Sequence, residues 1–246
     1  MDMKELEQTL VLIKPDALKN SLTGYVLSQL SEFHTGLRFA ATKIVCVTRM
    51  LAEEHYAEHR GKAFFPSLQE YIMGQIHYPD APWKRRVIAY VYQGPGAIQK
   101  IRDIAGPTNP HIARDTKPGS IRALGTVVPI KDAAGNIIDD RLDNLIHASA
   151  NKEDAEREIK LWFKPSDIPP LMRPYPTEVS REHYYYKDHK LFLSYEPDSI
   201  CFVAPGDVVW QSDMETLRLL AQGKTSPTTF EYVVAKYLIN LGEDFN

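Results

Sequence analysis

Residues 9–17 read Thr-Leu-Val-Leu-Ile-Lys-Pro-Asp-Ala, and the first five form a short apolar run that stops just before Pro15. An uninterrupted apolar run that ends at a proline is typical of a strand buried in a sheet. Further along the chain, stretches rich in β-branched and aromatic residues at 37–48 and 87–92 predict two more strands. Apolar residues flanking a turn predict a hairpin over 126–138.

Helices are predicted between these strands from apolar residues that recur at helical spacing. One spans 23–36 and ends at Gly36, and its apolar face comprises Val26, Leu27, Leu30 and Phe33. Others are expected at about 51–59, 65–73, 96–105 and 152–163, and the proline-containing stretch 107–122 is expected to be a long ordered loop. This order lacks the regular alternation of a parallel sheet, so an α+β fold with an antiparallel sheet is favoured.

Five prolines between 165 and 176 mark a linker-like segment after the last of these helices. We therefore expect a first domain over residues 1–164 and a C-terminal extension of unknown role over residues 165–246. The extension contains a tyrosine-rich stretch at 184–186, a strand candidate at 200–204 and two helical candidates. It either packs on the core of the first domain or forms a subunit-contact arm or a partner-binding module.

Composition excludes several classes of protein. The chain has 246 residues, 43% of them hydrophobic and 25% charged, and a formal net charge of −3. That charge is too small to indicate nucleic acid, a membrane surface or a polyanion as partner. Its two cysteines make no disulfide framework, and no apolar run reaches the roughly 20 residues of a membrane helix. The N-terminus also lacks the apolar core of a secretory signal, so a reduced cytoplasmic protein is expected.

Glu158 stands out in the helix predicted at 152–163. It lies three residues after Ala155 and four before Trp162, so helical spacing places it on or beside the apolar stripe. A carboxylate there is costly unless it has a partner. Either the side chain reaches solvent from the edge of the stripe, or it orients a nearby catalytic group.

Three short motifs suggest other chemistries. Gly-Pro-Gly-Ala-Ile-Gln at 94–99 lacks the third glycine of a dinucleotide fingerprint, and Gly-Lys-Thr at 223–225 lacks the earlier glycine of a P-loop. His-Tyr-Ala-Glu-His at 55–59 matches the inverted zinc-peptidase pattern, with His55 and His59 as ligands and Glu58 as the acid. Zinc would need a third ligand and a position for water, which the pattern does not supply.

Six segments in order carry a resemblance to a known family. They are Thr-Leu-Val-Leu-Ile-Lys-Pro-Asp-Ala at 9–17, Glu-Glu-His-Tyr-Ala-Glu-His-Arg-Gly-Lys-Ala-Phe-Phe-Pro-Ser-Leu at 53–68, Ala-Ile-Gln-Lys-Ile-Arg-Asp-Ile-Ala-Gly-Pro-Thr-Asn-Pro at 97–110, Lys-Pro-Gly-Ser-Ile-Arg at 117–122, Asn-Leu-Ile-His-Ala-Ser at 144–149 and Ala-Glu-Arg-Glu-Ile-Lys-Leu-Trp-Phe at 155–163. Over about residues 8–163 the chain resembles the nucleoside diphosphate kinases. The resemblance implies a ferredoxin-like antiparallel sheet with helices on its faces.

The resemblance also implies a role for each matched residue. His147 is expected to take the γ-phosphoryl group of ATP as a phosphohistidine and to return it to a second nucleotide, with Glu158 holding its imidazole and Tyr56 beside the phosphate path. The expected phosphate clamp comprises Lys14, Arg102, Thr108 and Arg122. Asn144 is expected to contact ribose and phosphate, and Phe64 and Leu68 to form the slot for the base.

Physical chemistry agrees with these roles. Phosphoryl transfer depends mostly on positioning and on cations that meet the charge of the transition state. One pocket can serve donor and acceptor in turn, for ATP and for other nucleoside di- and triphosphates, and an aromatic–aliphatic slot would discriminate poorly among bases. Mg²⁺ is expected to bind mainly through the nucleotide phosphates, with few or no direct protein ligands.

The chain departs from the family pattern in several places. Segments 73–86 and 126–141 are longer than usual, Ala123-Leu124 replaces the usual Gly-Asp, and Ala148 replaces the usual Gly after the nucleophile. A homo-oligomer is expected, but the insertions leave its size open. The main alternative is a nucleotide-binding regulatory protein of the same fold that has lost turnover, and the zinc peptidase is a third class.

Overall fold

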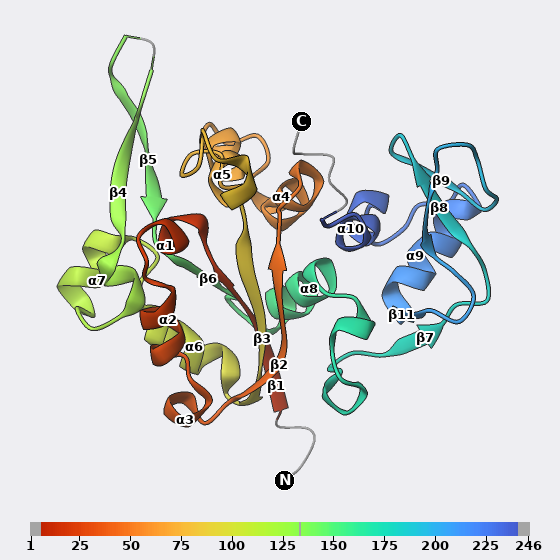
Figure 1. Cartoon of the computed structure of the whole chain (residues 1–246), viewed down its shortest axis with the longest axis horizontal. Helices are drawn as coiled ribbons and strands as arrows, with labels where there is room; N and C mark the ends of the chain where they lie inside the picture. Colours follow the sequence, from red (N-terminus) through yellow and green to blue (C-terminus); the bar gives the residue numbers. More distant parts are fainter. Residues whose placement is uncertain (1–5, 133, 241–246) are drawn as a thin grey trace.

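The computed structural model describes residues 6–132 and 134–240 (Figure 1). Its main sheet has the strand order β2-β3-β1-β6, with every neighbouring pair antiparallel. The four strands are β1 (Leu6–Ile13), β2 (Arg38–Val45), β3 (Val87–Pro95) and β6 (Ile146–Ala148). The expected α+β architecture on an antiparallel sheet is therefore confirmed.

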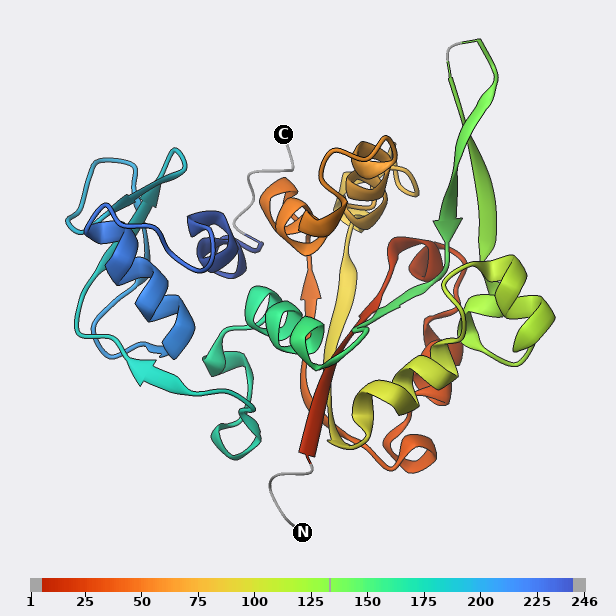
Figure 2. The ribbon, with the colours of Figure 1, turned by 180° about the vertical axis from the view of Figure 1, so that it is seen from behind.

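Strand β1 lies inside the sheet and is buried on both faces, which explains its uninterrupted apolar run. Leu10 and Leu12 pack into one core, whereas Val11 and Ile13 pack into the other, because successive side chains of a strand point to opposite faces. The helices on the Val11 face are α1 (Pro15–Lys19), α2 (Thr23–Gln29) and α6 (Ala97–Ala105). Those on the Leu10 face are α4 (Arg49–His55) and α8 (Lys152–Trp162), and the two views from front and back show this layering (Figures 1 and 2).

The single helix predicted at 23–36 is wrong, because the chain forms two helices there. After α2, Ser31 caps a short helix α3 (Glu32–Thr35) by accepting from the amide of His34, and the chain leaves it at Gly36 with φ of 68°. This restart shifts the helical phase, so Phe33 is fully exposed although Val26 and Leu30 are buried. A serine before a glutamate is a capping signal that outweighed the apolar periodicity.

The loop expected at 107–122 also contains regular structure. Helix α7 (Pro110–Thr116) begins there, because the Asn109 side chain accepts from the amides of His111 and Ile112 and Pro110 occupies its first turn. A 3-10 turn, η4 (Ile121–Leu124), follows. The Thr-Asn-Pro sequence therefore starts a helix within the segment expected to be a loop.

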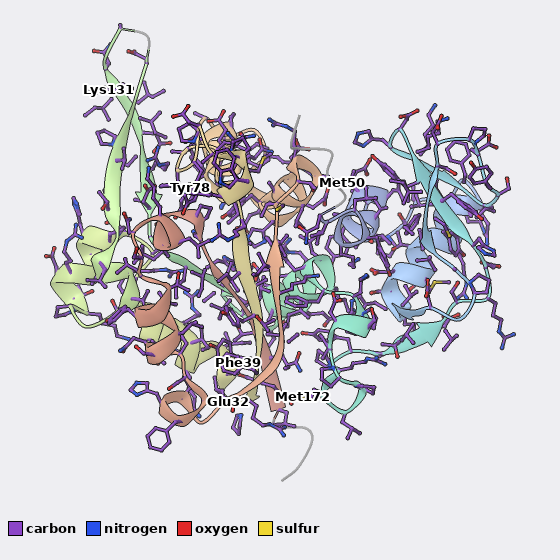
Figure 3. The ribbon with its side chains drawn as sticks, in the orientation of Figure 1. Glu32, Phe39, Met50, Tyr78, Lys131 and Met172 are labelled. Atoms are coloured by element: carbon purple, nitrogen blue, oxygen red, sulfur yellow. The ribbon has the colours of Figure 1, made fainter. Side chains whose placement is uncertain are left out.

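The predicted hairpin is present and longer than expected. Strands β4 (Thr126–Lys131) and β5 (Ile137–Asp143) pair only with each other and project well beyond the body of the molecule, with Lys131 near the outer part (Figures 1 and 3). The rest of the first domain comprises η2 (Ala57–His59), α5 (Phe65–Ile72) and η3 (Pro82–Lys84).

The C-terminal segment forms small antiparallel sheets, two α-helices and three 3-10 turns beyond α8. Its strands are β7 (Thr177–Val179), β8 (Tyr184–Lys187), β9 (Lys190–Phe192), β10 (Ile200–Val203) and β11 (Val208–Trp210). Its α-helices are α9 (Gln211–Ala221) and α10 (Phe230–Val234). Its 3-10 turns are η5 (Pro165–Asp167), η6 (Pro170–Met172) and η7 (Ala235–Tyr237). Trp210, Leu217 and Val233 belong to the same buried cluster as Leu10 and Trp162. The segment thus shares one hydrophobic core with the first domain. Across the described ranges, no helix is long and apolar enough to span a bilayer.

Candidate active site

One cavity of about 470 Å³ collects side chains from segments far apart in the sequence. All ten residues to which the resemblance gave a role line it: Lys14, Tyr56, Phe64, Leu68, Arg102, Thr108, Arg122, Asn144, His147 and Glu158. None of the ten lies elsewhere, so the structure brings the whole predicted set together.

His147 lies on the short edge strand β6, opposite Leu12 of β1. Its neighbours Ile146 and Ala148 are buried in the core on the other side of the sheet, so the imidazole faces α4 and α8. Just before this strand Leu145 has φ of 69°, a conformation that costs a non-glycine residue roughly 1–3 kcal/mol. Its amide donates to Asp16 Oδ2 over 2.9 Å, and its carbonyl accepts from the Lys14 amide over 2.9 Å, so this turn is held on both sides.

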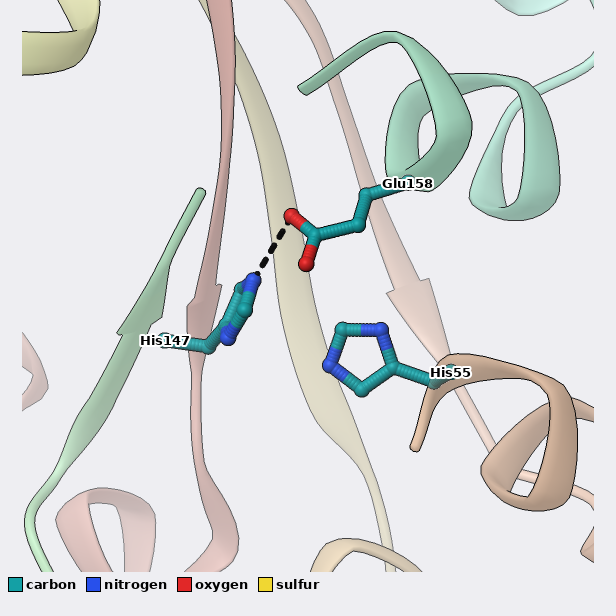
Figure 4. Close-up of side chains that lie close together, drawn as sticks. All are labelled: His55, His147 and Glu158. Carbon is teal, nitrogen blue, oxygen red and sulfur yellow. Dashed lines mark hydrogen bonds and ion pairs between the residues drawn. The ribbon is translucent and has the colours of Figure 1, made fainter. Parts of the chain in front are cut away.

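The carboxylate of Glu158 fixes the orientation of the His147 ring (Figure 4). His147 Nε2 lies 2.8 Å from Glu158 Oε2, and Ser149 Oγ donates to the same oxygen over 2.6 Å. Burial alone would raise the pKa of Glu158, but the charge and hydrogen bond of His147 and the hydroxyl of Ser149 lower it to about 2. Because the ionised carboxylate can only accept, Nε2 of a neutral His147 carries the proton and Nδ1 keeps its lone pair.

His55 is a second imidazole beside the first. Its ring centroid lies 4.6 Å from that of His147 at an angle of 77°, and the indole N–H of Trp162 donates to its Nδ1 over 3.2 Å. Burial and the neighbouring His147 hold the pKa of His55 well below its ordinary value, so the ring is neutral with its proton on Nε2. That nitrogen has no hydrogen-bond partner among the described residues, and it faces His147 (Figure 4).

Lys14 and Asn144 form one unit at the floor of the cavity. Lys14 Nζ donates to Asn144 Oδ1 over 2.8 Å, and Asn144 Nδ2 donates to the carbonyl of Thr108 over 2.9 Å. Lys14 is 6% exposed, and burial with the nearby charge of Arg122, only partly offset by Asp16, lowers its pKa to about 8. This amine is therefore charged at neutral pH but titrates just above it.

Arg122 and Arg102 add two more cations to the same cavity. The buried Arg122 guanidinium donates to the carbonyls of Gly106 and Ile146 over 2.9 and 3.3 Å. Burial and the charge of Arg102 lower its pKa to about 10, so it stays protonated at neutral pH. The three cations and His147 thus make one end of the cavity strongly attractive to a polyphosphate.

Three more predicted residues line the cavity near the end of α4 and the start of α5. Tyr56 is 8% exposed, and burial raises the pKa of its hydroxyl, which therefore keeps its proton. Phe64 is half-buried, with its ring 5.4 Å from that of His59, and Leu68 packs against the larger core. These side chains give the cavity an apolar wall beside its cationic end.

The zinc-peptidase interpretation of 55–59 is wrong. Helix α4 ends at His55, and His59 lies in the 3-10 turn that follows, so the two rings do not share a helix face. His55 points to His147, whereas His59 packs against Tyr56 and Phe64. Glu58, the expected acid, is exposed and pairs with His59 over 3.4 Å.

Several cavity residues were not predicted from the sequence. His55 lines the cavity beside His147, whereas Trp162 and Ser149 lie behind its lining and bond to His55 and Glu158. No local pattern marks the contact of His55 with Trp162. The hairpin contributes five more lining residues, which are Ile130, Asp139, Asp140, Arg141 and Leu142. An insertion just before the nucleophile was the signal for these.

Comparisons with known proteins agree with this arrangement. A sequence model described as nucleoside diphosphate kinase matches residues 7–168. A nucleoside diphosphate kinase of Pyrococcus furiosus is 40% identical over 166 residues, 68% of this chain and 88% of that protein, and one of Thermus thermophilus is 39% identical over 163 residues, 66% and 99%.

Solved structures of nucleoside diphosphate kinases resemble this chain as well. The Aquifex aeolicus nucleoside diphosphate kinase superposes with a TM-score of 0.53 at 32% identity, covering 67% of this chain and 99% of that one. A Borrelia burgdorferi nucleoside-diphosphate kinase with bound vanadate and ADP, described as a transition state mimic, superposes with a TM-score of 0.52 at 30% identity, covering 68% and 92%. From its sequence, its sheet and its cavity, this chain belongs to the nucleoside diphosphate kinase family.

Proposed function

We propose that this chain is a phosphotransferase that moves the γ-phosphate of a nucleoside triphosphate such as ATP to a nucleoside diphosphate. The transfer runs in two steps through His147. In the first, the Nδ1 lone pair attacks the γ-phosphorus, a P–N bond forms, and the bond to the bridging oxygen breaks so that the diphosphate leaves. In the second, a terminal oxygen of another nucleoside diphosphate attacks the same phosphorus and releases the neutral imidazole.

The observation that carries this proposal is the hydrogen bond between His147 Nε2 and Glu158, which leaves Nδ1 unprotonated in a cavity with three cations. Glu158 orients the ring and stabilises the positive charge that develops on it during attack. Ser149 in turn holds Glu158 and is itself held by the amide of Leu10 over 3.1 Å. The nucleophile is therefore aligned before substrate binds.

The cations meet the charge of the transferring group. Lys14 offers a point charge, and Arg102 and Arg122 offer guanidinium donors suited to phosphate oxygens. Thr108 and the protonated hydroxyl of Tyr56 add neutral donors on the phosphate path. Asn144 bonds to Lys14 and to the carbonyl of Thr108, and so it positions both residues. Its expected contact with ribose and phosphate is therefore made partly through these two neighbours.

The nucleotide is expected to enter with a divalent cation, which we propose is Mg²⁺ held by the phosphates. The side chains of the cavity suit an ion held in this way. The phosphate end of the cavity is lined by cations, and the carboxylate of Glu158 is already bonded to His147 and Ser149. Mg²⁺ bound in this way neutralises part of the phosphate charge and needs no protein carboxylate. Phe64 and Leu68 supply the apolar slot for the base.

Labelling tests the proposed activity. The chain is incubated with Mg²⁺ and ATP labelled at the γ-phosphate, and the protein is then assayed for a label that is acid-labile and alkali-stable and that moves to added GDP. Both are expected in the wild type and neither in His147→Ala. Nucleotide binding without any label would instead identify the non-catalytic regulatory protein.

Other expectations from the sequence stay proposals. We place the boundary of the kinase domain near residue 165, with a C-terminal extension that packs on the kinase core. A cytoplasmic location rests on composition alone. We also propose a homo-oligomer whose subunit packing depends on the projecting hairpin. Deletion of residues 129–138 should change the sedimentation coefficient beyond the lost mass, and an unchanged oligomer would remove that role.

A further inference from the structure

The β4–β5 hairpin forms one wall of the nucleotide cavity. It projects from the body in both views, yet several of its residues line the cavity (Figures 1 and 2). These are Ile130, Asp139, Asp140, Arg141 and Leu142. The proposed slot of Phe64 and Leu68 is therefore not the whole of the nucleoside site, because the hairpin adds charged and hydrogen-bonding groups to it.

Arg141 is the most firmly held of these groups. Its Nε and Nη2 donate to Asp143 Oδ1 and Oδ2 over 2.7 and 3.2 Å, a two-point contact that fixes the plane of the guanidinium. A guanidinium has five N–H groups, so three remain available after these two bonds. The side chain is 19% exposed, which leaves it accessible from the cavity.

Asp143 is held in place by the other insertion. His77 belongs to the lengthened segment 73–86, and its Nε2 lies 2.8 Å from Asp143 Oδ2. The His77 side chain is 8% exposed. Burial alone would raise the pKa of Asp143, but the hydrogen bonds from His77 and Arg141 lower it below its ordinary value. Asp143 thus stays ionised, and the two insertions form one unit behind the cavity wall.

This unit also reaches the floor of the cavity. The His77 ring lies 5.2 Å from the ring of Tyr71, and Lys14 Nζ lies 5.0 Å above that same Tyr71 ring. The orientation of Arg141 is therefore set by packed groups that continue to the phosphate-binding lysine. A guanidinium held in one orientation can distinguish ligands by where their hydrogen-bond acceptors lie, whereas a freely rotating surface arginine cannot.

The charge of the wall indicates which part of a nucleotide faces it. Two of the lining residues, Asp139 and Asp140, are acidic, and the charge of the third charged residue, Arg141, is neutralised by Asp143 behind the wall. The hairpin wall is therefore net negative, opposite in sign to the end that holds Lys14. A polyphosphate is attracted to the cationic end and repelled by this wall. The nucleoside part of the ligand is then the part that meets Arg141.

We propose that Arg141 is a specificity-determining residue that donates hydrogen bonds to carbonyl oxygens on the base. This inference rests on the proposed function and adds a base preference to it. A guanidinium only donates, so it matches O6 and N7 of guanine or O4 of uracil, whereas adenine and cytosine present an amino group at that position. We expect guanine and uracil nucleotides to be preferred by roughly tenfold or more.

The test uses the full chain already phosphorylated from labelled ATP. Loss of label is timed with GDP, UDP, ADP and CDP as acceptors, each at concentrations below saturation. The wild type should react at least about tenfold faster with GDP and UDP than with ADP and CDP. Arg141→Met, which keeps an unbranched apolar stem but removes the donors, should bring the four rates together.

Two further variants distinguish a loss of base preference from a general loss of activity. Lys131→Met changes an exposed cation of the same hairpin that does not line the cavity, and it should keep the wild-type ratio (Figure 3). Asp143→Asn frees the guanidinium and should weaken the preference while phosphorylation by ATP continues. If Arg141→Met fails to fold, the wild-type ratio and Asp143→Asn still test the proposal.

Two results would overturn it. Equal wild-type rates with all four acceptors would show that the base is not read. An equal slowing of all four by Arg141→Met would place the contact on ribose or phosphate. If no label forms at all, the proposed function fails separately, and calorimetric binding of GDP against ADP still decides whether the base is read.

Discussion

Trp162 donates its indole N–H to Nδ1 of His55, and this bond of 3.2 Å determines which nitrogen of that buried ring keeps a lone pair. Nδ1 is already used as the acceptor, so Nε2 carries the proton. The ring therefore presents a donor, not a lone pair, toward His147 (Figure 4).

This tautomer predicts that the site does not retain zinc, even though ligand atoms of His55, His147 and Glu158 all lie within 4.8 Å of one another. A metal needs the lone pair that Nε2 of His55 lacks. After incubation with Zn²⁺ and dialysis, we expect well under one equivalent of zinc by elemental analysis. Trp162→Phe removes the donor, allows the proton to move to Nδ1, and should increase zinc binding. One tightly held equivalent in the wild type would contradict this tautomer.

Glu158→Gln should slow phosphorylation of His147 without preventing nucleotide binding. The amide keeps the shape of the side chain but loses the charge that stabilises the developing imidazolium, and a hydrogen bond to a charged group contributes about 1.5–3 kcal/mol. We expect a fall of roughly 10- to 100-fold in the single-turnover rate. Glu153→Gln, at an exposed position in the first turn of the same helix, serves as the control. Equal effects of the two variants would show that Glu158 does not support the nucleophile.

The same carboxylate predicts a loss of stability in acid. Its pKa falls from 4.5 to about 2 on folding, so its contribution is complete above pH 4.5 and is lost as pH falls toward 2. At one pKa unit per 1.36 kcal/mol the contribution is on the order of 3 kcal/mol. Urea unfolding between pH 5 and pH 3 should show a smaller decline in Glu158→Gln than in the wild type. Parallel pH profiles of the two proteins would contradict the lowered pKa.

Lys14 predicts that nucleotide affinity weakens above neutral pH. Its pKa of about 8 in the empty cavity means that the charged form, which binds phosphate, is lost as pH rises through 8. Bound phosphate favours the charged form, so binding near pH 8.5 should take up protons. Calorimetry in buffers of different ionisation enthalpy measures that uptake. Lys14→Gln should bind more weakly and abolish the uptake, and an unchanged uptake in this variant would assign it to another group.

A buried ion pair within the extension predicts a large loss of stability when one partner is removed. Lys236 Nζ and Asp213 Oδ2 lie 2.8 Å apart, and their side chains are 0% and 1% exposed. Lys236→Met leaves a buried carboxylate without its partner and should lower the free energy of unfolding by roughly 3–5 kcal/mol. Adding Asp213→Leu should recover most of that loss.

The control for this pair lies on the same helix, α9. Arg218→Met breaks an exposed pair with Glu178 and should cost less than about 1 kcal/mol. Because the extension shares its core with the kinase domain, urea unfolding of the wild type should be a single transition. A first transition confined to the extension would contradict the shared core.

The sequence predicted those features that depend on short-range patterns. The apolar run at 9–13 predicted a buried strand. The position of Glu158 on or beside an apolar stripe predicted either a side chain that reaches solvent or a carboxylate that orients a nearby group, and Glu158 lies 2.8 Å from His147 Nε2. The site set came from six ordered segments, and all ten residues line one cavity. In each case the signal lies within one segment or in the order of several.

Features that depend on contacts between distant segments could not be predicted. His55 and Trp162 are 107 positions apart, and nothing local marks either as the partner of the other. The left-handed backbone at Leu145 is stabilised by a hydrogen bond from its amide to Asp16, which lies in a different element of the fold. The hairpin's contribution to the cavity likewise depends on the contact of His77, in segment 73–86, with Asp143 at the end of the hairpin.

The central claim is that Nδ1 of His147 is the phosphorylated atom. After brief labelling with ATP, ³¹P NMR of the unfolded protein at alkaline pH distinguishes phosphate on Nδ1 from phosphate on Nε2, and peptide mapping gives the residue. The hydrogen bond from Nε2 to Glu158 predicts a single phosphohistidine on Nδ1 of His147. Phosphate on Nε2, or on any other residue, would contradict the mechanism.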